Sequence, residues 1–170
     1  MTDQSYSDGI KLLEQYPNLV VLRTFSKIYG LAALRIGYGV ASPQIINLIN
    51  KVREPFNTSR LAQAGALAAL ADQAYVEQCR RLNSAGIVQL QGEFKRLGLK
   101  SFPAHGNFIM VDVRKPAAEV FDALLRLGII VRAGHRLYPT CIRVTVGSAE
   151  QNQSFITALE QTLKEQEVRA

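Results

Sequence analysis

A serine, a lysine and an arginine that suit phosphate and aldehyde chemistry stand together in residues 26–35. Lys27 follows an apolar run and precedes several apolar residues, so we expect its amine to lie in low-dielectric surroundings. Burial disfavours the ammonium form, and a neutral lysine is a nucleophile toward a carbonyl carbon. Ser26 and Arg35 supply a hydroxyl and a planar guanidinium, which bind phosphate oxygens. The segment fits a cofactor that carries an aldehyde and a phosphate, although a solvated lysine in a surface loop is the commoner source of such a pattern.

Two strands are predicted to position this loop. Residues 19–25 are apolar and rich in β-branched side chains, which is typical of a strand buried on both faces of a helix-covered parallel sheet. Residues 36–41 form the second predicted strand, and Pro43 begins a helix that extends to Lys51. The first 60 residues supply too few elements to bury the first strand on both faces. The chain therefore looks like the last part of a larger sheet domain followed by one complete small domain.

A long helical region follows the first strands. Residues 54–59 interrupt the pattern, because proline cannot continue a helix and Asn, Thr and Ser offer N-cap oxygens. Residues 59–97 are helical almost throughout, and we expect two helices that meet near Asp72. The predicted organisation has three parts, which are the end of a large sheet domain (1–60), bridging helices (61–97) and a small α/β domain (98–170).

Strands and helices alternate after Gly98. The hydrophobic patterns predict strands at 107–113, 129–132 and 141–146, and a helix over 116–128. A last helix begins at Ser148, which stands three residues before Gln151 in capping-box spacing. This order is typical of a small α/β unit whose sheet is covered on one side, and the predicted fold class is α/β.

Charge and composition exclude several classes of protein. The 170 residues carry a net charge of +6, but the longest basic run is Arg80-Arg81 and the other basic residues are scattered, so no nucleic-acid partner is expected. No run approaches the ~18 consecutive apolar residues of a membrane helix, and no membrane partner is expected. The first six residues have neither the basic flank nor the apolar run of a secretory signal, so a cytoplasmic protein is expected.

The cysteines and histidines do not form a recognisable site. Cys79 and Cys141 stand far apart without a CxxC motif, so both are expected to be reduced thiols. His105 and His135 have no second histidine or cysteine at ligand spacing, and no metal site is expected.

Residues 23–38 (Arg-Thr-Phe-Ser-Lys-Ile-Tyr-Gly-Leu-Ala-Ala-Leu-Arg-Ile-Gly-Tyr) closely resemble the lysine segment of fold-type I pyridoxal-phosphate aminotransferases. Within that superfamily the segment is most similar to the histidinol-phosphate aminotransferases. The likeness continues through 53–59, Asn107-Phe108 and the Arg-x-Thr-x-Gly motif in 142–147, so it covers essentially the whole chain.

The resemblance implies a role for each residue of the lysine segment. Lys27 would bind pyridoxal 5'-phosphate covalently and, once released, carry a proton between the substrate carbon and the cofactor carbon. Thr24 and Ser26 would bind near the cofactor phosphate through their hydroxyls, and Arg35 would be its charged partner.

Two further arginines are implied to bind substrate. Arg143, flanked by Ile142 and Val144, would lie buried in a strand and hold the anionic end of the substrate, and Arg132 would help to bind the phosphate of histidinol phosphate. A phosphate dianion in a closing site needs more than one counter-charge.

The implied activity is transamination between histidinol phosphate and 2-oxoglutarate in histidine biosynthesis, by a homodimer. In such enzymes a phosphate-binding turn, a stacking aromatic residue and the carboxylate that pairs with the cofactor ring lie upstream of the lysine. None is found here, so we expect a C-terminal fragment that is inactive by itself. An aminotransferase of aromatic amino acids remains an alternative, and so does a non-catalytic domain with a vestigial lysine.

Overall fold

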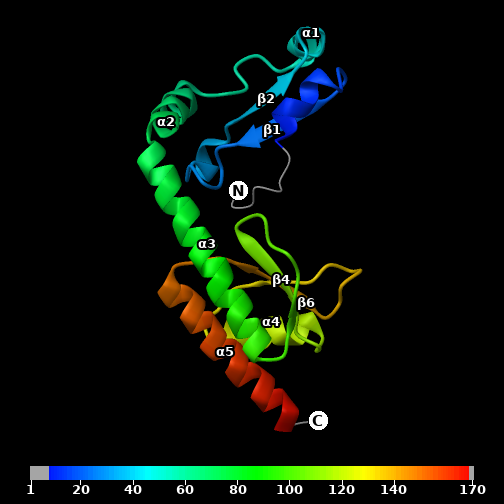
Figure 1. Ribbon diagram of the computed structural model, residues 1–170, viewed down its shortest axis with the longest axis vertical. Coiled ribbons are helices and arrows are strands. Elements are labelled where there is room, and N and C mark those ends of the chain that lie inside the picture. Colours follow the sequence, from blue (N-terminus) through cyan, green and yellow to red (C-terminus); the bar gives the residue numbers. More distant parts are fainter. Residues whose placement is uncertain (1–7, 169–170) are drawn as a thin grey trace. The chain divides into compact units, whose positions relative to one another are not determined.

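The computed structural model describes residues 8–168, and predictions that concern residues 1–7 lie outside this range. The described part of the chain divides into an N-terminal unit that ends at Arg80 and a C-terminal unit that begins at Arg81. The boundary falls within helix α3 (Gln73–Arg96), which is continuous through it (Figure 1). This is a different partition from the three-part organisation at residues 60 and 97, which stays a prediction.

The N-terminal unit contains an antiparallel hairpin of β1 (Val20–Thr24) and β2 (Gly37–Ala41). The prediction of a parallel strand buried on both faces is wrong. Of the five β1 residues only Val21 is buried, and Leu22 is 74% exposed. The physical reason is that β1 pairs with the next strand in the chain, and within residues 8–168 no other strand extends this sheet.

Helical elements precede the hairpin, lie within its connection and follow it in the sequence. They are the short 3-10 helices η1 (Gly9–Glu14) and η2 (Ala32–Leu34) and the α-helices α1 (Pro43–Val52) and α2 (Arg60–Ala71). Ser59 caps α2, because its Oγ accepts a hydrogen bond from the Ala62 amide at 3.1 Å. Asp72 follows α2, and its Oδ1 accepts a hydrogen bond from the Tyr75 amide at 3.0 Å. This bond caps the start of α3. The predicted meeting of two helices near Asp72 is confirmed.

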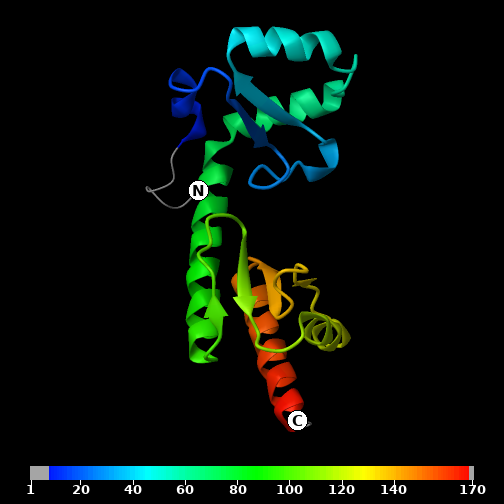
Figure 2. The ribbon, with the colours of Figure 1, turned by 90° about the vertical axis from the view of Figure 1, so that its right-hand side faces the viewer.

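The C-terminal unit is a four-stranded antiparallel sheet in the order β3-β4-β6-β5, packed against helices (Figure 2). Its strands are β3 (Lys100–Ser101), β4 (Phe108–Asp112), β5 (Arg132–Ala133) and β6 (Cys141–Thr145), and its helices beside α3 are α4 (Ala117–Arg126) and α5 (Ala149–Val168). The strand predicted at 129–132 is shorter and later than expected, and β3 was not predicted. The predicted capping box is confirmed, since Ser148 and Gln151 exchange side-chain to backbone hydrogen bonds of 2.9 and 3.2 Å.

One face of this sheet builds the core of the unit. Strand alternation directs Ile109, Val111, Ile142 and Val144 to the same side, where all four are buried. Side chains from three helices complete this core, namely Leu90 and Phe94 of α3, Val120 and Leu124 of α4, and Ile156 and Leu159 of α5. The other face is more exposed, so the predicted sheet covered on one side is confirmed.

Candidate active site

The lysine segment connects β1 to β2, and buried Phe25 anchors it. The Phe25 amide donates to the Ile36 carbonyl at 3.2 Å, and the Phe25 carbonyl accepts from the Leu31 amide at 3.0 Å. The Phe25 ring also contacts the rings of Tyr29 and Tyr38, with centroids 4.9 and 5.9 Å apart. These contacts close the backbone around Ser26 and Lys27 into a defined loop.

Lys27 lies on the outside of this loop and is exposed. The expected low-dielectric surroundings are therefore wrong for the described part of the chain. The apolar residues that follow Lys27 do not cover it, because Ala32, Ala33 and Leu34 are themselves exposed. Within residues 8–168 no hydrogen bond or ion pair engages the Lys27 amine, so its three donors are open to a ligand.

Thr24, Ser26 and Arg35 lie at the loop end of the hairpin together with Lys27. The Thr24 hydroxyl oxygen accepts a hydrogen bond from the Ser26 amide at 3.0 Å, which leaves the hydroxyl proton for another acceptor. Arg35 has a left-handed backbone, with φ 52°, which is uncommon for a residue with a side chain. Its Nη1 donates to the Ala32 carbonyl at 2.8 Å, and this bond uses one of five N–H donors.

Gly37 allows the two strands to approach closely at this end. A Cβ atom at this position would lie 2.6 Å from the Arg23 carbonyl oxygen, which is closer than real Cβ contacts occur. Thr24 is its partner across the hairpin. The close approach therefore fixes where Thr24 lies relative to the strand that begins just after Arg35.

The four side chains form a donor set that fits a phosphate beside an aldehyde. The set has two hydroxyls, a guanidinium and a primary amine, and it contains no carboxylate that would repel an anion. Hydroxyl and guanidinium donors bind phosphate oxygens, and a lysine amine reacts with an aldehyde. The residues that are present thus fit pyridoxal phosphate.

Arg132 and Arg143 lie directly opposite each other on β5 and β6. Directly opposed residues in an antiparallel pair point to the same face, with Cβ atoms about 5 Å apart. Both arginines are exposed, on the face that does not form the core. Like charges at such positions repel each other, so the arrangement favours binding of an anion between or above them.

The expectation that Arg143 is buried is wrong, because strand alternation sends its neighbours Ile142 and Val144 into the core and Arg143 to the opposite face. The Arg143 guanidinium carbon lies 5.1 Å from the centre of the Phe108 ring, a cation–π contact. Phe108 was not predicted to belong to the site. The alternation of residues 107–113 can place its side chain on the exposed face, but its contact with Arg143 depends on the pairing of β4 with β6.

The other residues considered from the sequence have local roles. Cys141 is buried, and burial raises the pKa of its thiol, whereas Cys79 is partly exposed. Neither forms a disulfide within the described part of the chain. The His135 Nδ1 accepts a hydrogen bond from the Leu137 amide at 3.2 Å. No group of three metal-binding side chains, and no helix long and apolar enough to cross a membrane, occurs among residues 8–168.

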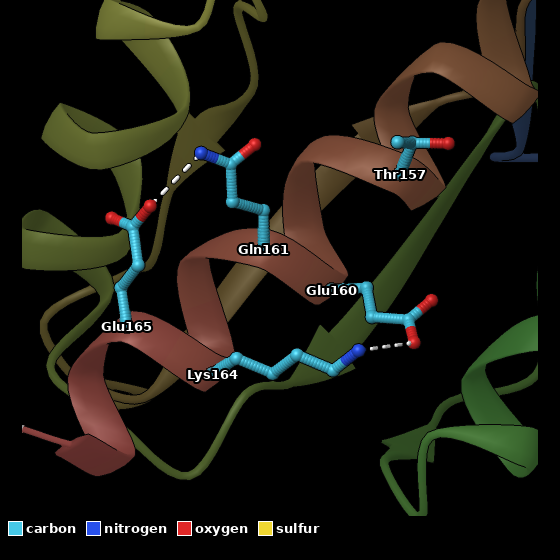
Figure 3. Close-up of a pocket in the computed structure, with 5 residues that line it drawn as sticks. All are labelled: Thr157, Glu160, Gln161, Lys164 and Glu165. Atoms are coloured by element: carbon cyan, nitrogen blue, oxygen red, sulfur yellow. Dashed lines mark hydrogen bonds and ion pairs between the residues drawn. The ribbon is translucent and has the colours of Figure 1, made fainter.

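A hollow on the surface of α5 is lined by Thr157, Glu160, Gln161, Lys164 and Glu165 (Figure 3). Its charged and polar groups bind one another. Glu160 pairs with Lys164 at 3.1 Å, and the Gln161 amide donates to Glu165 at 2.9 Å. All five residues come from one helix and none belongs to the predicted site, so we assign no function to this hollow.

The structure brings the predicted residues together as two groups. Thr24, Ser26, Lys27 and Arg35 belong to the N-terminal unit, and the arginine pair belongs to the C-terminal unit. The N-terminal unit thus carries a lysine beside hydroxyl and guanidinium donors, and the C-terminal unit carries a pair of opposed guanidinium groups.

The family model described as aminotransferase class I and II matches residues 1–159. The chain belongs to this family, and it has the fold of fold-type I aminotransferases. The resemblance seen in residues 23–38 is confirmed.

Two of the individual relatives share one name, histidinol-phosphate aminotransferase. The chain is 49% identical over 164 residues to histidinol-phosphate aminotransferase from Bacillus velezensis, which covers 96% of this chain and 46% of the relative. It is 52% identical over 163 residues to the enzyme of the same name from Anoxybacillus flavithermus, covering 95% and 44%. The chain thus spans less than half the length of these curated relatives.

Solved structures agree with this assignment. The histidinol-phosphate aminotransferase from Sinorhizobium meliloti, solved in complex with pyridoxal-5'-phosphate, superposes with a TM-score of 0.80 at 32% identity, covering 88% of this chain and 42% of the other. A putative histidinol-phosphate aminotransferase from Erwinia carotovora atroseptica gives 0.90 at 22% identity, covering 96% and 48%, and supports the fold alone.

Proposed function

We propose that this chain is the C-terminal part of an enzyme that transfers an amino group between histidinol phosphate and 2-oxoglutarate in histidine biosynthesis. The observation that carries the proposal is the identity of about half of all residues, over nearly the whole chain, to histidinol-phosphate aminotransferases. In this proposal residues 1–60 end the cofactor-binding domain, 61–97 bridge the domains and 98–170 form the small domain. The enzyme is cytoplasmic and homodimeric in the same proposal.

The proposed cofactor is pyridoxal 5'-phosphate. When bound, it supplies an electron sink that stabilises negative charge on the substrate carbon. Lys27 would hold the cofactor at its aldehyde carbon, and Thr24, Ser26 and Arg35 would hold its phosphate. The open donors of these four side chains support this assignment, and so does the cofactor bound to the Sinorhizobium relative.

Lys27 would also act on protons. After release from the cofactor, its Nζ would take the proton from the substrate carbon that carries the amino group and would deliver it to the aldehyde carbon of the cofactor. The exposed position of Lys27 at the tip of an anchored loop supports this role. The amine can turn about its four-carbon stem while Phe25 fixes the backbone beneath it.

Arg132 and Arg143 would hold the anionic end of the substrate. A phosphate dianion carries about two negative charges near neutral pH, which two guanidinium groups can match. A 2-oxo acid carboxylate carries one, for which Arg143 suffices. The opposed register of the two residues supports this division of roles.

Covalent labelling tests the proposal. The full 170-residue chain is mixed with pyridoxal phosphate, the attachment is reduced with borohydride, and mass spectrometry of the digest locates the label. We expect a visible absorption band and a label on Lys27. Lys27→Ala should abolish both, whereas the control Lys51→Ala, which removes an exposed lysine from the same unit, should change neither. Labels spread evenly over the lysines would contradict a built cofactor site.

A further inference from the structure

Asn152 is a fully engaged polar side chain in the interior of the C-terminal unit. It is only 2% exposed, at the start of α5. Its Oδ1 accepts a hydrogen bond from the Gly147 amide at 2.9 Å, and its Nδ2 donates to Gln89 Oε1 at 3.2 Å and to the Gly147 carbonyl at 3.4 Å. A buried amide that is satisfied in this way fixes the direction of each partner, which an apolar side chain would not do.

Two more side-chain amides hold the same end of the sheet. Asn83 Nδ2 on α3 donates to the Gly106 carbonyl at 3.0 Å, just before β4. Gln89, on the same helix, donates to the Ala149 carbonyl at 3.4 Å in addition to binding Asn152. We define Asn83, Gln89 and Asn152 as the amide clamp.

Gly86 lies between the two α3 members of the clamp and lets the helix approach. A Cβ atom at Gly86 would lie 2.9 Å from Asn152 Nδ2 and would overlap a methyl group of Val146. The helix therefore packs directly on the segment that leaves β6. No side chain could be added at residue 86 without moving one of the elements that the clamp joins.

The clamped end of the sheet carries the arginine site. The Val146 amide donates to the Asn107 carbonyl at 2.9 Å, and the next pair in the register is Phe108 with Thr145. The Phe108 ring in turn makes the cation–π contact with the Arg143 guanidinium. Gly106 and Gly147, the residues that the clamp holds next to the strands, are thus two residues from Phe108 and four residues from Arg143.

We propose that the amide clamp is a positioning device for Arg143. By fixing the start of β4 and the end of β6, it holds the Phe108 ring in place and so sets the direction of the guanidinium. The inference rests on the proposed function only where it takes Arg143 as the residue that binds the substrate's anionic group. The clamp residues themselves act through the backbone and contact no substrate.

Nuclear magnetic resonance on the full chain tests this proposal. In the wild type, the Phe108 ring should shift the Arg143 side-chain signals upfield. We expect Asn152→Ala to remove this shift. Because the Arg143 guanidinium then loses its fixed direction, binding of inorganic phosphate should weaken about fivefold, which is less than loss of a whole charge-assisted contact would cause. Gln89→Leu removes the Oε1 acceptor of the Asn152 amide at a partly exposed position, and it should also reduce the shift.

The matched control is Leu159→Ala, a core truncation on the same helix that leaves the clamp intact. It should lower stability while leaving the Arg143 shift unchanged. An unchanged shift in both clamp variants, or an equal loss in the control, would overturn the proposal. If the wild-type chain binds no phosphate, or binds it equally well after Arg143→Ala, the proposal that Arg143 binds an anion is wrong. The ring shift of the Arg143 signals still tests whether the clamp positions this side chain.

Discussion

Arg132→Gln should change the stability of the C-terminal unit in opposite directions depending on whether phosphate is present. Without phosphate, the two opposed guanidinium groups repel each other. Two unit charges about 6 Å apart in water repel by about 0.7 kcal/mol, and salt reduces this value. The variant should therefore be more stable than the wild type by about 0.5 kcal/mol, which corresponds to a rise in Tm of about 2–4 °C for a unit of this size.

Phosphate should reverse this order. At ten times its Kd, phosphate stabilises the wild type by about 1.4 kcal/mol. Loss of one charge-assisted contact should weaken binding about tenfold, so the same concentration stabilises the variant by only about 0.4 kcal/mol. The wild type then becomes the more stable protein by about 0.5 kcal/mol.

Thermal unfolding followed by circular dichroism, with and without phosphate at constant ionic strength, measures both signs. Arg81→Gln is the matched control, because it removes one positive charge from an exposed position of α3 and leaves the opposed pair intact. The control should show the phosphate response of the wild type. The reasoning is refuted if Arg132→Gln and Arg81→Gln respond identically, since net charge alone would then explain the effect.

Three further predictions follow from the contacts described. Gly37→Ala should disrupt the pairing of β1 with β2, because the new Cβ would meet the Arg23 carbonyl, and amide hydrogen exchange in β1 should accelerate. Hydrogen bonds from Arg96 and Lys164 lower the pKa of Glu160, so its contribution to stability is present above the unfolded value near 4.3 and is lost as pH falls through the lower folded pKa. Glu160→Gln should therefore lower Tm at neutral pH, and the difference from the wild type should disappear in acid. The isolated chain, which spans less than half of its curated relatives, should show no turnover of histidinol phosphate with 2-oxoglutarate, and measurable turnover would contradict the proposal that it is only a part of the enzyme.

Local signals allowed most of the helices and the strands of the C-terminal unit to be predicted from the sequence. The capping pair Ser148 and Gln151 forms the hydrogen bonds that its spacing predicts, and Asp72 separates two helices as expected. These features depend on contacts between residues three or four positions apart. The sequence pattern contains both partners, so the prediction needs no knowledge of the remaining fold.

The errors concern burial, which depends on distant parts of the chain. The apolar run at 19–25 indicated a strand buried on both faces, but β1 pairs only with β2, and Leu22 is exposed. The same pattern led to the expectation that Lys27 is covered. An apolar run shows that a segment can be buried, whereas the elements packed against it decide whether it is.

The opposed arginines illustrate why the proposed functional positions are harder to predict than core positions. Ile142 and Val144 reveal their role by their own apolar character, and they are buried as such residues should be. Arg143 lies between them on the opposite face, and its partners Phe108 and Arg132 are set by strand register, which no local pattern contains. Residue types in 107–113 and 129–146 were sufficient to identify the strands, but only the pairing of β4, β6 and β5 places one aromatic ring and two guanidinium groups on one surface.

The amide clamp extends this reasoning to residues that carry no functional signal at all. Amide side chains such as those of Asn83, Gln89 and Asn152 are common on exposed helix surfaces. Nothing in the spacing of these three residues distinguishes them from solvated amides. Their importance arises because α3 and α5 pack on one end of the sheet and leave backbone groups there that need partners. A site on an exposed strand face has no core around it to fix its side chains, so its precision must come from the strand ends. Satisfied amides provide that precision because each hydrogen bond specifies a direction as well as a distance.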